Sequence, residues 1–264
     1  MIGFRIAGLA TIAAVACALL PVTAHSLEAV GVLKKASEAM GATHLNSLRY
    51  TGSGMVAAGG LAAKAGAPSP NGTPLRVVRA INYDTASLSE EITEYKVELP
   101  GAPREPVSPG ERRSIAFVSG PDAWNATGSV VAPAPGSATE RIHQIWITPH
   151  GVIKAAMRNN ATMEWKTLGG KSVAVVSFEQ PGRFKATAFI NGKYLVEKVE
   201  SIVAAPGGRE KKVVTTYGEY QSFGPIMFPM QVTQSLDGRL ALDIKVRETQ
   251  PNNPVNIAVP ASLK

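Results

Sequence analysis

The chain has 264 residues, of which 45% are hydrophobic and 18% charged, and its formal net charge is +7. This length allows one large or two small domains. The cations are dispersed, with pairs such as Arg112-Arg113 and Lys211-Lys212 rather than runs, which argues against the clustered basic face of a nucleic-acid-binding protein. A weak attraction to anionic membrane surfaces is the most that this charge predicts.

Residues 1–24 have the pattern of a secretory signal peptide. Arg5 precedes the apolar run 6–20, and small residues lead up to Ala24, after which we expect cleavage and release into the periplasm or the medium. Two alternatives stay open: an uncleaved membrane anchor, for which the run is short, and a lipoprotein anchored at Cys17, which follows a lipobox-like Ala-Val-Ala. Cys17 is the only cysteine, so a mature chain without it has no disulfide and no cysteine metal site.

An amphipathic helix is expected directly after the leader, over residues 27–43. Its apolar side chains recur at helical spacing, and Gly41 is the expected stop. A second short helix is expected from Pro149 to Asn159, with Thr148 as its cap and Pro149 at its first position. The apolar positions of the first helix are Ala29, Val32, Leu33, Ala36 and Met40, and those of the second are Val152, Ile153, Ala156 and Met157.

Most of the remaining chain is predicted to form β-strands. In the first half, strands are expected at 48–58, 75–83, 87–97, 113–119 and 122–127. Loops rich in proline, glycine and alanine are expected at 59–74, 99–110 and 128–138. These strands are bounded by the residue types that end strands.

The second half is predicted to be a series of hairpins. The pairs Gly169-Gly170, Asn191-Gly192 and Asp237-Gly238 each separate two strand-like runs, and such pairs suit tight hairpin turns because they tolerate positive φ. The runs lie at 162–168 and 171–179, at 183–190 and 193–203, and at 226–236 and 239–249. A further corner is expected at Gly224-Pro225, inside the tract 215–229.

Alternation along these strands gives one apolar and one polar face. Leu240, Leu242, Ile244 and Val246 alternate with polar or small residues in the last strand, so one face needs a cover. The pattern predicts a mainly β fold, a large curved antiparallel sheet or half-barrel, with the two short amphipathic helices covering its concave face. We expect a single domain over residues 25–249 and an extended tail over 250–264.

This organisation resembles the periplasmic lipoprotein carriers and the outer-membrane lipoprotein-sorting fold. The similar pieces are the post-leader helix LKKASEAMGA, the strand opening RYTGSG, the hairpin AFINGKYLVEKVES and the tract TTYGEYQSFGPIMFPMQV. The resemblance implies a half-barrel that binds a lipid, a lipidated protein or another hydrophobic ligand without catalysis.

A closer resemblance is to the N-terminal domain that precedes a metallo-β-lactamase-fold hydrolase domain in certain exported bacterial proteins. It is carried by INYDTASLSEEI, AFVSGPDAWNATG, IWITPHGVIKAAMRNNATMEW and LVEKVES. The metal motif His-x-His-x-Asp-His of those hydrolases is absent from this sequence. The resemblance therefore implies, as the alternative function, an accessory domain for a hydrolase partner carried by another chain or lost by truncation.

Few residues have the pattern of a catalytic or metal site. His143 and His150 are seven residues apart, which matches no metal-ligand spacing, and a histidine near a helix start is expected to be a surface or capping residue. Ser53 lacks the context of a nucleophile elbow. Glu90, Glu91 and Glu94 are interpreted as a solvated strand edge. We therefore expect no enzyme, no cofactor and no metal.

The apolar side chains are the better candidates for function. A half-closed sheet with two short helices leaves room for an apolar groove, and methionine adapts to irregular ligands. The alternative for each residue is simple core packing. The predicted groove residues are Trp146, Met157, Phe184, Phe228, Met230 and Leu242.

Overall fold

The computed structural model describes residues 21–57, 72–95, 111–204 and 209–263. The expected leader up to residue 20, and most of the expected loops at 59–74 and 99–110, lie outside the described residues. The strands of the described part are β1 (Ser47–Ala57), β2 (Gly72–Asn82), β3 (Ser87–Tyr95), β4 (Glu111–Ser119), β5 (Asp122–Thr127), β6 (Val130–Pro133), β7 (Thr162–Leu168), β8 (Lys171–Gln180), β9 (Phe184–Ile190), β10 (Val196–Ala204), β11 (Glu210–Phe223), β12 (Ile226–Leu236) and β13 (Arg239–Pro251).

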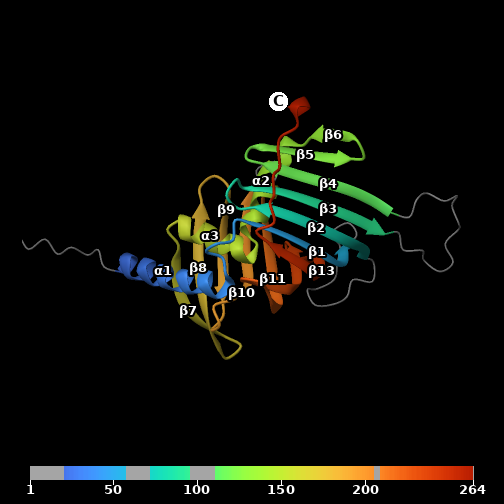
Figure 1. The fold of residues 1–264 in the computed structure, drawn as a ribbon. Coiled ribbons are helices and arrows are strands. Elements are labelled where there is room, and N and C mark those ends of the chain that lie inside the picture. Colours follow the sequence, from blue (N-terminus) through green and yellow to red (C-terminus); the bar gives the residue numbers. More distant parts are fainter. Residues whose placement is uncertain (1–20, 58–71, 96–110, 205–208, 264) are drawn as a thin grey trace, which may run out of the picture.

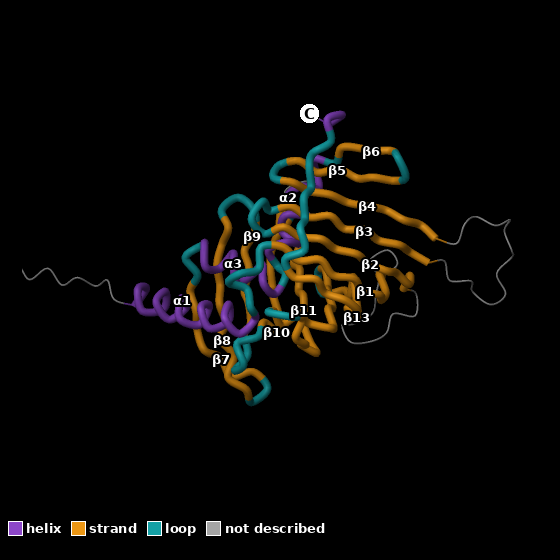
Figure 2. Tube along the Cα trace, in the orientation of Figure 1, coloured by secondary structure: helices purple, strands orange, loops and turns teal. Residues whose placement is uncertain are grey.

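These strands form one antiparallel sheet. Their order is β6-β5-β4-β3-β2-β1-β13-β12-β11-β10-β9-β8-β7, so nearly every strand pairs with its neighbour in the chain, while β1 and β13 join the two ends of the described strand series. The outermost strands β6 and β7 do not pair with each other, and the sheet curves without closing (Figures 1 and 2). The predicted mainly β half-barrel is confirmed.

The first helix, α1, spans Pro21–Met40. The predicted apolar positions from Ala29 to Met40 are all buried. Gly41 ends the helix as expected, with φ of +69°. Its N–H donates to the carbonyl of Glu38 at 3.1 Å and that of Ala42 to the carbonyl of Ser37 at 2.7 Å, the two bonds of a Schellman motif.

The sequence patterns predict two helices, and the described residues form three α-helices on the concave face (Figure 1). Pro149–Arg158 forms α3, and Thr148 caps it by accepting a hydrogen bond from the Gly151 N–H at 3.1 Å. The additional helix, α2, spans Ala138–Trp146. The expected loop at 128–138 holds β6 and the short 3₁₀ helix η2 (Pro135–Ser137), and α2 begins at its last residue.

Two of the three predicted two-residue turns are confirmed. Gly169-Gly170 and Asp237-Gly238 have positive φ at both positions, as type I′ turns require. The turn at Asn191-Gly192 is wrong: β9 ends at Ile190 and β10 begins at Val196, and the positive φ of +60° falls at Tyr194. The Asn191 side chain accepts hydrogen bonds from the N–H groups of residues 193 and 195, and this local bonding favours a longer loop.

The helices and the concave face of the sheet share one hydrophobic core. We call this face of the sheet the inner face and the opposite one the outer face. The main cluster joins α1, α2 and α3 to inner side chains from both halves of the sheet. A second, smaller cluster contains Leu75, Val77 and Ile244, with Val56, Ile92 and Leu242 packed against it. Most of the concave face is therefore filled by the protein's own side chains.

The C-terminal segment after β13 crosses the outer face. Residues 252–260 have no regular structure, and the short helix η3 (Ala261–Leu263) follows. The Ser47 hydroxyl donates to the carbonyl of Asn253 at 2.6 Å, and the Asn82 amide donates to that of Val255 at 3.0 Å. The segment runs over β1 to β5 towards the end of the sheet (Figure 1). Between it and the sheet lies an open groove of about 590 Å³.

Candidate ligand-binding site

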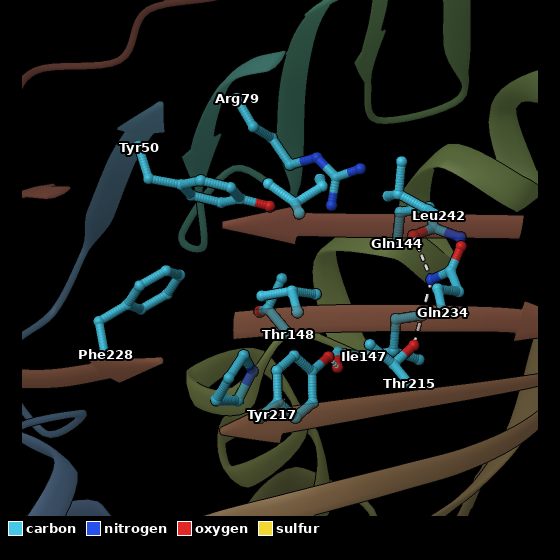
Figure 3. Close-up of a pocket in the computed structure, with 13 residues that line it drawn as sticks. Tyr50, Arg79, Gln144, Ile147, Thr148, Thr215, Tyr217, Phe228, Gln234 and Leu242 are labelled. Carbon is cyan, nitrogen blue, oxygen red and sulfur yellow. Dashed lines mark hydrogen bonds between the residues drawn. The ribbon is translucent and has the colours of Figure 1, made fainter. Parts of the chain in front are cut away.

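A small cavity lies on the inner face, beneath the junction of α2 and α3 (Figure 3). Its volume is about 20 Å³, roughly the space that one water molecule needs. An acyl chain does not fit in this space. Side chains that define the cavity are Tyr50, Arg79, Thr148, Tyr217, Phe228 and Gln234.

One wall of the cavity carries a buried ion pair. Arg79 of β2 and Glu90 of β3 are direct cross-strand partners, and their side chains are 10% and 21% exposed. Arg79 Nε donates to Glu90 Oε2 at 2.7 Å, and Nη2 donates to the same oxygen. Burial is the largest influence on Arg79 and lowers its pKa, whereas the charge and the hydrogen bond of Glu90 act in the opposite direction, and the net effect is a raised pKa.

Hydroxyl groups fasten the α2–α3 junction to the sheet. The Tyr217 hydroxyl of β11 donates to the carbonyl of Ile147 at 2.5 Å. The Tyr83 and Thr148 hydroxyl groups share a hydrogen bond of 3.1 Å. Burial raises the pKa of both tyrosines, so they stay protonated and keep these bonds at physiological pH.

Amide groups add a further link on the other side of the cavity. Gln234 of β12 donates through its Nε2 to Gln144 of α2 at 3.2 Å and to Thr215 of β11 at 3.1 Å (Figure 3). The helices are thus held over the cavity by a few polar contacts as well as by apolar packing.

His143 and His150 are both buried, and they form hydrogen bonds with different parts of the protein. His150 of α3 donates from Nε2 to the carbonyl of Met40, the last residue of α1, at 3.0 Å. His143 of α2 shares a hydrogen bond of 2.8 Å with the Ser201 hydroxyl of β10. The expectation that His150 lies at the surface is wrong, since both side chains are fully buried. Burial lowers the pKa of each to about 4.

The six predicted groove residues do not form one open groove. Trp146, Phe184 and Phe228 are buried in the main cluster. Met230 is partly buried against that cluster, and Leu242 against the smaller one. Phe228 and Leu242 meet at the cavity. Met157 of α3 is 54% exposed, so its side chain lies at the surface. A role of these residues in ligand binding stays a prediction.

The sequence patterns miss the polar residues of the cavity. Glu90 and Glu91 were expected on a solvated edge, but β3 lies inside the sheet and the two carboxylates face opposite sides. Glu91 pairs with Arg113 on the outer face at 2.7 Å. A signal for the inner pair does exist. In β2, Arg79 interrupts the alternating apolar series of Leu75, Val77 and Ile81, and in β3 Glu90 stands between Leu88 and Ile92.

Other kinds of site find little support in the described part of the chain. Residues 21–57, 72–95, 111–204 and 209–263 contain no group of three histidine, cysteine, aspartate or glutamate side chains placed to hold a metal ion. Over the same ranges, no helix has the length and apolarity needed to cross a bilayer. Cys17 and the apolar run of the leader lie outside the described residues.

The fold is similar to solved structures of the lipoprotein-carrier kind. A LolA superfamily protein from Nitrosomonas europaea superposes with a TM-score of 0.53 at 14% identity, covering 86% of this chain and 94% of that one. An outer membrane lipoprotein-sorting protein domain from Vibrio parahaemolyticus gives 0.50 at 8% identity, covering 88% and 95%. A DUF1329 family protein from Desulfovibrio piger gives 0.51 at 9% identity, covering 89% and 95%.

These similarities establish the fold alone. The sequence identities are too low to assign a function or a family to this chain. No family model matches the sequence, and no curated protein matches it. The predicted lipoprotein-carrier-like fold is therefore confirmed. None of the three structures concerns a metallo-β-lactamase-fold hydrolase, so the predicted association with such an enzyme gains no support.

Proposed function

We propose that this protein is an exported, non-catalytic binding protein whose concave face receives a lipid, a lipidated protein or another hydrophobic ligand. The observation that carries the proposal is the large apolar cluster on the inner face beneath α1, α2 and α3. The similarity to a LolA superfamily protein and to a lipoprotein-sorting domain supports the same class of ligand. Export follows from the leader, with cleavage near Ala24 or, as the alternative, lipidation at Cys17.

Ligand entry requires the helical cover to move. The cavity of about 20 Å³ is far too small for an acyl chain, whereas burial of each methylene contributes about 0.8 kcal/mol once space is available. The α2–α3 unit is the part best placed to move, since its hydrogen bonds to the sheet are made through side chains, among them those of Arg141, Tyr217 and Gln234. Displacing this unit opens the inner face between the two apolar clusters.

A cross-link between helix and sheet tests the proposal. Gln144 of α2 and Gln234 of β12 lie in hydrogen-bond contact beside the cavity, and Cys17, the only cysteine, lies in the predicted leader. In the mature chain, Gln144→Cys with Gln234→Cys can be joined by a short bis-maleimide. We expect the unlinked protein to bind the neutral probe N-phenyl-1-naphthylamine and the linked protein to lose at least about tenfold in affinity.

The single-cysteine variants treated with the same reagent are the matched controls, because they carry the modification without the link. If the linked protein binds the probe as well as these controls, ligands do not enter beneath α2. If the wild type shows no saturable binding, the proposed function is wrong. Native mass spectrometry of protein purified without detergent then identifies the bound molecule and the mature N-terminus.

A further inference from the structure

The inner face carries a charged pair in the middle of an apolar surface. Val77 and Ile81 flank Arg79 along β2, and Leu88 and Ile92 flank Glu90 along β3. Desolvating two ions costs more than a well-packed apolar pair in the same place, so such a pair is weak as a stabilising device. Because the pair lies beside the cavity, it is better suited to ligand binding than to stabilising the fold.

Glu90 engages only part of the guanidinium of Arg79, and the Tyr50 side chain interacts with another part. Nε and Nη2 both donate to one oxygen of Glu90, so the two N–H groups of Nη1 stay outside the pair. The Tyr50 ring lies 5.9 Å from the guanidinium, and its hydroxyl and Arg79 point to the same side of the cavity (Figure 3). Glu90 is the more exposed partner and can therefore turn away when another anion arrives.

An apolar strip begins at the same cavity. Leu242 and Ile244 line the cavity and also belong to the smaller cluster with Leu75 and Val77. A cation and a hydroxyl group therefore stand on one side of the cavity, and an aliphatic surface on the other. This arrangement matches a molecule with one anionic end and one hydrocarbon chain.

We propose that the site takes an acyl-chain amphiphile with a carboxylate head, which replaces Glu90 as the partner of Arg79. The carboxylate accepts hydrogen bonds from the guanidinium, whose planar fork matches its geometry, and from the Tyr50 hydroxyl. The chain lies over Leu242 and Ile244. A carboxylate restores the charge balance that Glu90 gives up, whereas a doubly charged phosphate leaves an unbalanced negative charge. This assignment rests on the proposed function, because entry still requires the helices to move.

Oleate and oleyl alcohol separate the head from the chain. They share the same hydrocarbon chain, and calorimetric titration of the full mature protein with each gives their affinities. We expect oleate to bind at least about tenfold more tightly, the scale of a charge-assisted hydrogen bond. Acetate at the same concentrations should show no binding, which distinguishes an amphiphile site from a site for free carboxylates.

Two single variants should change the preference in opposite directions. Arg79→Gln removes the cation, and the ratio of oleate to oleyl alcohol affinity should fall to about one. Glu90→Gln removes the internal competitor, and that ratio should rise above the wild-type value. Arg76→Gln, on the same strand but exposed on the outer face, is the matched control and should leave the ratio unchanged.

The outcomes separate this inference from the proposed function. Equal binding of oleate and oleyl alcohol by the wild type overturns the carboxylate assignment and leaves the proposed function standing. Binding of neither overturns both. A purely structural ion pair predicts that both variants lose stability without changing the ratio. The double variant Arg79→Gln with Glu90→Gln, which buries no unpaired charge, should fold and show a ratio of about one.

Discussion

Two buried histidines each connect a helix of the cover to another part of the protein. His143 ties α2 to β10, and His150 ties α3 to the end of α1. Among the described residues, the Nδ1 atom of each is buried without a hydrogen-bond partner. Protonation therefore places a charge and an unsatisfied N–H group in the core, beside Phe184 in one case and Phe228 in the other. The nearby cations Lys211 and Lys154 oppose that charge further.

These histidines predict a loss of stability in mild acid. Their pKa is about 4 when folded and about 6.5 when unfolded. Since the folded pKa is the lower one, the stabilisation is complete above pH 6.5 and is lost as the pH falls towards 4. Between pH 7 and 5 we expect a loss of about 2 kcal/mol per histidine in the free energy of unfolding, measured with urea. The substitutions His143→Gln and His150→Gln should each reduce this pH-dependent loss by the contribution of one histidine.

His44 provides the control for this experiment. Its side chain is exposed, so His44→Gln should leave the pH dependence unchanged. The carboxylates Glu91 and Glu200 have a lowered pKa because of their basic partners, so they stay ionised throughout this pH window. Equal stability of the wild type at pH 5 and 7 would contradict the role given to the histidines.

At the scale of elements, local sequence predicts most of the structure. The stripe from Ala29 to Met40 and the Gly41 stop define α1, and paired glycine or Asp-Gly turns define two hairpins. Local sequence does not predict the secondary structure of segments whose conformation depends on tertiary contacts. The helix α2 has its apolar residues Ile142, Ile145 and Trp146 at helical spacing, but its few apolar positions follow a proline- and alanine-rich segment. Packing on the inner face is what makes this segment a helix.

Gly31 within α1 and Gly41 just after its end should respond to alanine in opposite ways. Gly41 has a positive φ, and a Cβ atom there would lie 2.0 Å from the carbonyl oxygen of Pro225. Gly41→Ala should therefore lower the free energy of unfolding by more than about 2 kcal/mol, because it combines backbone strain with a clash against the β11–β12 turn. Gly31 lies exposed within the helix with nothing within 4 Å of its Cβ position.

Gly31→Ala should accordingly stabilise the protein by about 0.5–1 kcal/mol through helix propensity. Denaturant titration of both variants gives the comparison directly. A neutral Gly41→Ala would show that the end of α1 is not held against the β11–β12 turn. Such a result would also weaken the role of His150, which bonds to the carbonyl next to Gly41.

At the scale of the whole molecule, the sequence predicts the sheet better than the site. Alternation identifies which face of each strand is apolar, and this determines the half-barrel. It does not show how far the helices fill the concave face, since that depends on side-chain volumes from distant segments. Phe228 illustrates the limit: the pattern places it correctly on the inner face, but only the fold stacks it on His150 and brings its ring against the tilted ring of Tyr50. The pair of Arg79 and Glu90 likewise needs the register of β2 and β3.

The architecture also predicts where the molecule opens first. Strands β1, β12 and β13 lie inside the sheet and are hydrogen-bonded on both sides, so their amides should exchange only by global unfolding. The helices α2 and α3 rest on the inner face through side chains alone, and a cover that admits ligand must leave it without unfolding the sheet. In native-state hydrogen exchange at pH 7, amides of α2 and α3 should therefore exchange with an opening free energy at least about 2 kcal/mol below that of the central strands.

The cross-link between residues 144 and 234 should abolish this difference for α2. Equal protection of helices and central strands in the unlinked protein would mean that the cover and the sheet unfold as one unit, and the concave face would then be a permanent core rather than a binding site.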